Sequence, residues 1–503
     1  MSITERRLTI AMAAAVALVV ARAAVFLLWE QASFDSDQAI FGLMAKHIAE
    51  GRAFPMFIYG EQYLLGVEAW LAAPLFAVLG PSVAVSKLPL VLINIVTAGL
   101  LVWLLHRDGG LRSVTALVCS LFYVWAAPAL AGSLVDTAGG NPEPFLYVLL
   151  LWVLRHRPLA FGVVFGIGFT HREFTAYGVS AIVGLALLDS WRVTSERLKA
   201  VALAGIGYMV VWQLVRTGFV FSNPFGPGAA IAAPLGGGNN IEGLASRYCW
   251  APETIVPGLG AMFGNYAGIM FGADNHRLSD VGVRSVLVRT NVPGLPGFWP
   301  LLGAIFVVAL ARVIWISLRD HIPIWRGRGA VGAFLLLVGL QAGVAYSVAR
   351  CGRLELTTLR YSLLTLYLGV GVVTLFFIYE TQRRWRWSMV SVMLAWALAS
   401  GAAHARLLNE YIYHEPSNPR RQLATYLVDH GIRYARSDYW TAYATTFLAG
   451  ERVLIASTET VRINRYQSEV DAHRKEAVTV RREPCETTAG PEVVPGTYWI
   501  CHE

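Results

Sequence analysis

Residues 83–105 read VAVSKLPLVLINIVTAGLLVWLL, a run of 23 residues in which Lys87 is the one charged side chain. A helix needs about 20 largely apolar residues to cross the roughly 30 Å hydrocarbon core of a bilayer. Similar runs occur before it at 8–29 and after it along most of the chain up to residue 403. Because a segment in lipid must satisfy its own backbone hydrogen bonds, each run is predicted to be a helix.

The apolar runs predict an α-helical, polytopic membrane protein with about 11 transmembrane helices. Two of the runs, 144–155 and 158–172, are shorter than a full crossing. The predicted spans are 8–29, 83–105, 113–130, 144–155, 158–172, 174–188, 200–216, 297–317, 329–349, 361–379 and 388–403.

The overall composition excludes an ordinary water-soluble protein. Of the 503 residues, 55% are hydrophobic and only 15% are charged, whereas a soluble domain carries about a quarter charged residues. The composition changes near residue 404, because residues 404–503 hold 25 charged side chains in 100. We therefore expect a membrane domain over 1–403 and a soluble domain over 404–503.

The region 404–503 mixes helical and strand-like patterns, which predicts a small α/β domain. A helix is expected near 418–430, ending at Gly431. Short strands are expected at 432–435, 452–456 and 477–480.

The distribution of Lys and Arg predicts the orientation. With the N-terminus inside, fifteen of these residues fall in inner segments and six in short outer segments, which favours a cytoplasmic N-terminus and an outer C-terminus. The first span is predicted to be an anchor, because its apolar stretch exceeds a signal-peptide core. We therefore expect a multi-pass protein of the bacterial inner membrane, with outer loops at 30–82 and 217–296 and with 404–503 outside the cytoplasm.

Charge and cysteine usage extend this picture. The net charge of +8 arises from the membrane domain, because residues 404–503 sum to −1, so membrane lipids are expected partners and nucleic acid is not. Four cysteines would lie outside, and four allow three pairings. We favour Cys485–Cys501, because both lie in the tail in an oxidising compartment, with unpaired thiols as the alternative.

The first outer loop contains the most informative residues. Apolar residues at 40, 41, 44, 45 and 48 recur as on one face of a helix, so 37–50 is predicted to lie flat on the membrane surface. Asp37 begins this helix, where an Asp is favoured as a cap whatever the protein does. Capping does not account for a second carboxylate at Asp35, or for Glu61 and Glu68 in the same loop. Carboxylates beside an apolar face suit general-base chemistry, so catalytic roles are predicted for Asp37 and Asp35.

A second candidate group is the outer segment 350–361, RCGRLELTTLRY. Arg350, Arg353 and Arg360 would lie outside, against the positive-inside bias. Guanidinium groups match phosphate oxygens, and a helix beginning near Arg360 would add its positive end to the same site. These arginines are predicted to bind a phosphate, the alternative being contact with lipid headgroups.

A third group is His171-Arg172-Glu173 at the outer end of a short span. Ionisable residues beside a span are functional candidates, so His171 and Glu173 are predicted to bind substrate. His171 could also join Asp35 or Asp37 around a metal, while the alternative is an ordinary outer turn. Two weaker candidates, Asp136 and Glu143, lie on the same face. The long loop 217–296, rich in Gly and Pro, is expected to be a lid, a binding loop or a disordered segment.

Several of these motifs resemble those of one enzyme family. The pattern Asp37-x-Ala39-x-x-x-x-x-Ala45, followed by Gly51, Tyr59-Gly60-Glu61-Gln62-Tyr63, Glu68 and Pro74-Leu75, resembles the first periplasmic loop of GT-C membrane glycosyltransferases. The resemblance is to bacterial members of the dolichyl-phosphate-mannose protein mannosyltransferase type, which include lipid A aminoarabinose transferases. Arg360-Tyr361 and the tail segment 438–443, DYWTAY, resemble motifs of the same group.

The resemblance implies roles for individual residues. An Asp of the first loop acts as the catalytic base in this family, which falls on Asp37, and Arg360-Tyr361 would lie near the carrier phosphate. The resemblance also predicts that Glu61, Tyr63 and Glu68 bind substrate. The usual Asp-Glu pair is Asp37-Gln38 here, which leaves open whether Asp35 supplies the second carboxylate. Metal dependence differs between branches of the family, so the cofactor stays unknown, with a divalent metal possible.

The expected function is transfer of a hexose or pentose from a polyprenyl-phosphate donor to a lipid, glycan or protein acceptor at the outer face. Asp37 would deprotonate the acceptor and Arg360 would stabilise the leaving phosphate. The sequence contains no P-loop or strand-borne dinucleotide motif. One alternative is a lipid or lipid-linked glycan flippase, which usually shows internal repeats and interrupted helices. Another is a non-enzymatic envelope scaffold that works through its tail.

Overall fold

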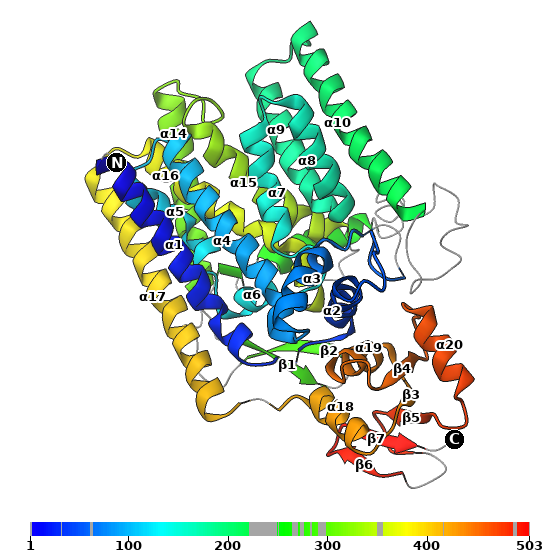
Figure 1. The fold of residues 1–503 in the computed structure, drawn as a ribbon. Helices are drawn as coiled ribbons and strands as arrows, with labels where there is room; N and C mark the ends of the chain where they lie inside the picture. The colour runs from blue at the N-terminus through cyan, green and yellow to red at the C-terminus, as the bar shows by residue number, and fades with distance from the viewer. Residues whose placement is uncertain are drawn as a thin grey trace.

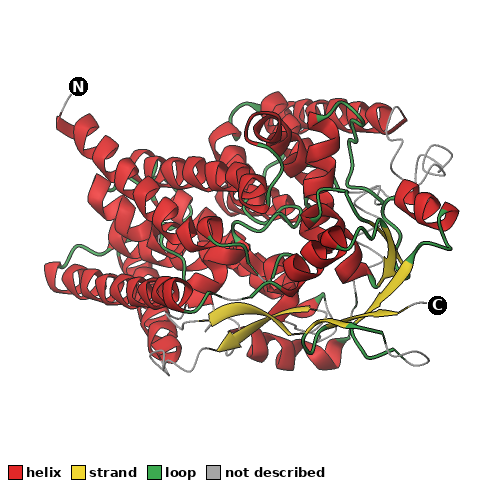
Figure 2. Cartoon of the chain, turned by 60° about the horizontal axis from the view of Figure 1, so that its bottom comes forward, coloured by secondary structure: helices red, strands yellow, loops and turns green. Residues whose placement is uncertain are grey.

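The computed structural model shows a helical bundle beside a small sheet-containing region (Figure 1). In Figure 2 the strands gather at one side of the helices. The structure describes residues 3–31, 33–60, 64–220, 249, 251–263, 270–271, 276–281, 284–289, 298–349, 356–415, 417–485 and 490–501.

Seven helices in the described part of the chain are long and apolar enough to cross a membrane. The protein is therefore a multi-pass membrane protein. The seven are α1 (Ile3–Leu28), α4 (Val83–Arg107), α10 (Ser195–Val220), α14 (Phe298–Arg319), α15 (Gly329–Val348), α16 (Leu366–Tyr379) together with the end of the 3-10 helix η5 (Leu356–Thr365), and α17 (Arg383–Tyr413).

The prediction of about 11 full spans exceeds these seven, because four predicted spans form shorter helices. At a rise of 1.5 Å per residue, helices of 12 to 14 residues reach only about 20 Å. The run 113–130 is also broken, since a separate short helix, α6 (Pro128–Ser133), begins at a proline. The four shorter helices are α5 (Ser113–Val124), α7 (Glu143–Leu154), α8 (Pro158–His171) and α9 (Ala176–Asp189).

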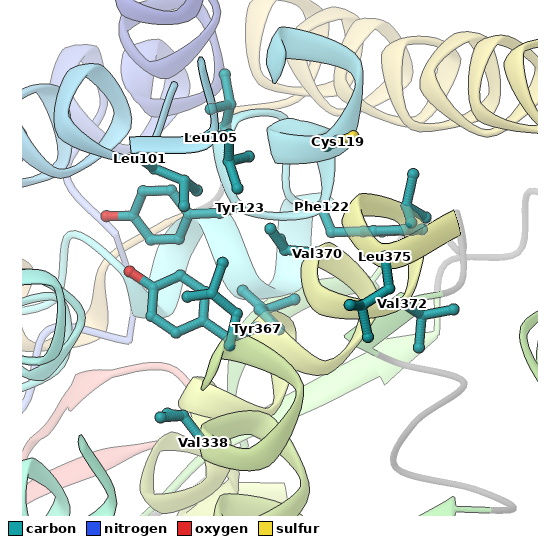
Figure 3. Packing of buried hydrophobic residues seen from close by; sticks show 14 of the residues in the cluster. Leu101, Leu105, Cys119, Phe122, Tyr123, Val338, Tyr367, Val370, Val372 and Leu375 are labelled. Atoms are coloured by element: carbon teal, nitrogen blue, oxygen red, sulfur yellow. The ribbon is translucent and has the colours of Figure 1, made fainter. Parts of the chain in front are cut away.

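The centre of the bundle is packed with aromatic and branched side chains from α5, α14, α15, α16 and α17. The Phe122 ring lies 4.5 Å from the Trp396 ring, centroid to centroid, and 5.4 Å from the Phe306 ring in an edge-to-face arrangement. Figure 3 shows Tyr123 and Tyr367 pointing their hydroxyl groups the same way. Tyr367 donates to the Phe145 carbonyl at 3.1 Å, so the buried phenol is satisfied within the protein.

Two basic side chains of the bundle are buried and paired inside it. Arg22 on α1 donates to Asn94 Oδ1 at 2.6 Å and to the Tyr123 carbonyl. Lys87 on α4 pairs with Asp136 at 3.3 Å. Charges placed in a span are expensive unless they find partners inside the bundle, so these contacts hold α1, α4 and α5 together.

The C-terminal region contains a five-stranded sheet with the strand order β4-β3-β5-β7-β6. Strand β3 is parallel to both neighbours, and β7 is antiparallel to β5 and β6. Cys485 and Cys501 form a disulfide in this region. The elements are α18 (Pro419–Asp429), β3 (Tyr434–Ser437), α19 (Tyr439–Leu448), β4 (Leu454–Ser457), α20 (Asn464–Ala472), β5 (Val478–Arg481), β6 (Glu492–Val494) and β7 (Tyr498–Cys501).

The predicted α/β character of this region is confirmed, with strands at the three expected places and two more after them. Gly431 follows α18 with a φ of +68°, the left-handed conformation that ends many helices. Helix α17 continues to Tyr413, so the change of composition near 404 falls inside a helix. The helix extends past the break because its last turns still bury Leu407 and Tyr411.

Part of the predicted long loop 217–296 is ordered into regular elements. It contains the 3-10 turn η3 (Pro252–Thr254), helix α12 (Ile255–Ala261) and the antiparallel pair β1 (His276–Val281) and β2 (Arg284–Arg289). The hairpin lies between the bundle and the C-terminal region in Figure 1.

Helix α2 of the first loop packs its apolar side chains against protein, in one cluster with the C-terminal region. Helices α2 (Ser36–Ala49) and α3 (Val67–Leu79) lie between the bundle and α19 (Figure 1). Most of the apolar stripe of α2 is buried, with Ile40 and Met44 both 0% exposed and Ile48 partly buried, in one cluster with α19. The apolar stripe that was expected to face the membrane surface is therefore covered by protein. An apolar stripe of this spacing indicates that one face of the helix is covered, but it does not indicate whether lipid or protein covers that face.

Phe447 is the central side chain of this contact. Its ring lies 5.6 Å from the Phe34 ring and 6.3 Å from the Phe76 ring. It also packs against Gly42, where an added Cβ would come within 2.6 Å of the ring. Only glycine lets the two helices approach this closely.

Phe447→Ala should destabilise the folded protein by about 3 kcal/mol, because it leaves a cavity between α2 and α19. The matched control is Phe54→Ala, since Phe54 is 59% exposed and should cost well under 1 kcal/mol. Thermal unfolding of the purified protein in detergent compares the two variants. Equal losses would show that Phe447 does not carry the contact.

Candidate functional site

The two carboxylates at the start of α2 have different roles. Asp35 is the N-cap, with its side chain accepting from the Gln38 amide at 3.1 Å. Asp37 lies in the first turn of the helix. The alternative interpretation of Asp37 as a helix cap is therefore wrong, because the cap is Asp35, two residues earlier in the chain. With the cap supplied by Asp35, the Asp37 carboxylate is available for other contacts.

Asp37 is held by two residues that are distant in the sequence. Its Oδ2 accepts from Arg360 Nη2 at 3.2 Å, and its Oδ1 accepts from the Tyr439 hydroxyl at 2.8 Å. Arg360 lies in η5, and its Nη2 is also 3.4 Å from the Tyr361 hydroxyl. The structure thus brings the predicted base together with the predicted Arg-Tyr pair.

These residues line a cavity of about 320 Å³ between the bundle and the C-terminal region. Its wall contains three arginines, Arg172, Arg360 and Arg462, against the two carboxylates Asp37 and Glu459. Arg172 donates to the Gly139 and Ala138 carbonyls, and Arg462 lies over the Tyr439 ring at 5.7 Å. An excess of fixed guanidinium groups makes the cavity suited to an anion.

The two aspartates differ in pKa. Burial and the neighbouring charge of Asp37 raise the pKa of Asp35 to about 7. Burial would also favour the neutral form of Asp37, but the Arg360 charge and the Tyr439 hydrogen bond outweigh it and lower the pKa of Asp37. Burial raises the pKa of Tyr439, so its hydroxyl stays a donor. At neutral pH the cavity therefore contains an ionised Asp37.

Other predicted site residues lie elsewhere. Glu68 and His171 gather with Glu143 behind the cavity wall, with one ligand atom from each within 4.8 Å of the others. Among the described residues, these three side chains form the group of acidic and histidine residues that could hold a metal ion. The group contains neither Asp35 nor Asp37. Glu173 begins the turn η1 (Glu173–Thr175) and is not among the described residues that line the cavity. Glu61, Tyr63, Arg350 and Arg353 lie outside the described residues.

Arg172 and Arg462 were not predicted to belong to the site. Arg172 follows His171 directly, and its basic side chain at the outer end of a span was a usable signal. Arg462 follows β4 in the tail and carries no motif. It reaches the cavity because its backbone amide donates to the Tyr443 hydroxyl at 2.6 Å, a contact that depends on tertiary folding.

Comparison with solved structures identifies the fold. The apo oligosaccharyltransferase of Archaeoglobus fulgidus aligns with a TM-score of 0.51 and 13% identity, over 94% of this chain and 69% of that chain. The oligosaccharyltransferase AglB from the same organism, in complex with an inhibitory peptide and a dolichol-phosphate, aligns with a TM-score of 0.50 and 11% identity, over 95% and 70%.

The chain has the GT-C fold.

This agrees with the resemblance found in the sequence motifs. ArnT from Cupriavidus metallidurans bound to undecaprenyl phosphate aligns over 96% of this chain and 97% of that chain, with 13% identity and a TM-score of 0.38, so the fold comparison rests on the two archaeal structures. No family model and no curated protein match the sequence. The identities show a common fold and leave function to be argued from the cavity.

Asp35→Asn should stabilise the protein more at pH 8 than at pH 5. Asn is a good cap, but it lacks the carboxyl whose pKa is raised from 3.8 to about 7. Between these values the folded wild type binds a proton that the unfolded chain does not, so its stability falls as pH rises through this window and stays reduced above it. The variant escapes this loss.

The difference in unfolding temperature between Asp35→Asn and wild type should therefore grow from pH 5 to pH 7 and then level off. Thermal unfolding at four pH values measures it. A difference that does not change with pH would contradict the assignment of a raised pKa to Asp35.

Proposed function

We propose that the protein transfers a sugar from a polyprenyl-phosphate donor to an acceptor at the outer face of the membrane. The observation that carries this proposal is the single cavity shared by an ionised Asp37 and three arginines. A sugar phosphate needs cationic groups on the phosphate and a base for the incoming nucleophile. The cavity offers both within one wall.

In the proposed reaction, Asp37 accepts the proton of the acceptor as the acceptor atom bonds to the anomeric carbon. The bond from that carbon to the phosphate oxygen breaks, and its electron pair leaves with the carrier phosphate. Arg360 stabilises the charge that develops on this phosphate. The carboxyl group of Asp35 influences the charge of the site because it lies beside Asp37.

The resting pair between Asp37 and Arg360 fits this role. Their side chains are 24% and 23% exposed, and 3.2 Å separates the paired atoms. Both side chains line the cavity, so an arriving phosphate can replace Asp37 as the partner of Arg360. The exchange would release Asp37 from its charge partner and make it a stronger base.

The position of the cavity in the bundle supports the proposed outer location. Helix α1 has 26 residues and reaches about 39 Å, with Arg7 near its start and Asp37 in the next helix. Arg7, Arg112, Arg383 and Arg386 line a second cavity at this opposite end. Basic residues mark the cytoplasmic side, so we place the N-terminus inside, the Asp37 cavity outside and residues 404–503 as an extracytoplasmic domain.

The fold comparison is consistent with a lipid-linked substrate. The second archaeal structure is a complex with a dolichol-phosphate and a peptide. We extend the carrier chemistry to this chain and leave the sugar and the acceptor class (lipid, glycan or protein) to experiment.

Asp37→Asn should lower transfer at least 100-fold, since a general base contributes about 10²–10⁴ to the rate. The purified protein is incubated in liposomes with undecaprenyl-phosphate sugars extracted from cell membranes. Mass spectrometry follows the loss of each donor and the appearance of free undecaprenyl phosphate.

The control is Asp471→Asn, a matched change at a side chain that pairs with Arg436 on the surface. It should turn over donor at the wild-type rate. Wild-type turnover by a folded Asp37→Asn protein would refute the proposed base and favour a transport or scaffold role.

A further inference from the structure

Behind the cavity wall, three acid and imidazole groups share one fully buried space. Glu68 comes from α3, Glu143 from the first turn of α7 and His171 from the last turn of α8. Their exposed fractions are 1%, 1% and 0%. One ligand atom from each lies within 4.8 Å of the others. Three helices therefore converge on a single polar point.

Most of the polar atoms of this cluster have no hydrogen-bond partner among the described residues. Both carboxylate oxygens of Glu143 are buried and unpartnered, and so is Glu68 Oε2. Buried polar atoms are almost always paired, and a buried carboxylate is costly unless a charge compensates it. A bound cation would compensate the charge of these buried carboxylates and give their oxygens a partner.

The contacts that do exist orient the groups as ligands. Glu68 Oε1 accepts from the Gly140 amide at 2.8 Å, which leaves Oε2 open. His171 Nδ1 contacts the Tyr147 hydroxyl at 3.1 Å, and its Nε2 has no partner. A hydrogen bond on one ring nitrogen commonly fixes a histidine that binds a metal through the other.

We propose that Glu68, Glu143 and His171 bind one divalent transition-metal ion. Two carboxylates and one imidazole are oxygen and nitrogen ligands of the kind that Zn²⁺ and Mn²⁺ accept. The ion's two positive charges balance the two carboxylates, while the imidazole stays neutral. The site differs from the metal set expected from the sequence, which joined His171 to Asp35 or Asp37.

The ion would fix the position of Arg172 in the cavity wall. Arg172 follows His171 in the chain, and its guanidinium donates to the Gly139 and Ala138 carbonyls. Gly140 has a φ of +89°, and a Cβ there would overlap the Arg172 side chain. The same short loop therefore gives an amide to Glu68 and its carbonyls to Arg172. This makes the three ligands positioning residues and not catalytic ones.

Metal content tests this proposal without any turnover, so its failure can be told from failure of sugar transfer. The full-length protein is stripped with chelator, incubated with Mn²⁺ or Zn²⁺, and passed through gel filtration before elemental analysis. Wild type should retain one ion per chain. Glu143→Gln should bind at least 100-fold more weakly, while the control Glu173→Gln, two residues from His171, should bind as wild type does.

A wild-type measurement keeps the test decisive if Glu143→Gln does not fold. Pulsed electron paramagnetic resonance of the Mn²⁺-loaded protein should show coupling to one imidazole nitrogen. Absence of a retained ion, or a retained ion without nitrogen coupling, would overturn the site. The Glu143→Gln variant could instead be more stable than metal-free wild type and bind metal equally well. That result would overturn the metal site and indicate that the carboxyl groups of Glu68 and Glu143 share a proton.

Discussion

The packing of helix α2 against α19 is the constraint on which the candidate site depends. Asp37 projects from α2, while Tyr439 and Arg462 come from the C-terminal region. Ser36 connects them, since its hydroxyl donates to the Tyr439 carbonyl at 2.6 Å and accepts from the Ala444 amide at 3.2 Å. Without this contact the cavity would lose one wall and Asp37 one of its two partners.

A second contact, at the other end of α2, also fixes this helix relative to the C-terminal region. Glu451, which follows α19, accepts from the Tyr466 hydroxyl at 2.6 Å and contacts His47 Nε2 at 3.0 Å. It also pairs with Lys46 and Arg52. Burial would raise the pKa of Glu451, but hydrogen bonds from His47, Arg52 and Lys46 outweigh it and lower this pKa. The carboxylate is therefore ionised at neutral pH and joins the first loop to the C-terminal region electrostatically.

Much of the fold could be predicted because membrane helices and the tail follow local rules. Apolar length located the long helices, and the rise in charge located the α/β region. Length alone could not separate a full span from helices such as α7 or α9, whose ends depend on packing within the bundle. Pattern alone could not tell that Ile40 and Met44 are covered by protein, in one cluster with side chains of α3 and α19.

The site was predictable where chemistry and motif coincide. Asp37 and Arg360 were selected from their residue types and from the resemblance of their motifs to one family, and their paired atoms lie 3.2 Å apart. Arg462 and the grouping of Glu143 with Glu68 were not predictable, because they are created by contacts between elements far apart in the chain. That Asp35 and not Asp37 caps α2 was not predictable, because helix ends depend on backbone geometry that sequence fixes only to within a residue or two.

The proposed function requires that the carrier phosphate binds the arginines beside Asp37. Native mass spectrometry of the protein extracted in a mild detergent measures this directly. Wild type should retain an isoprenoid phosphate, and Arg360→Gln should lose it while the surface variant Arg436→Gln keeps it. Equal retention by all three proteins, or no isoprenoid phosphate on any of them, would contradict the account.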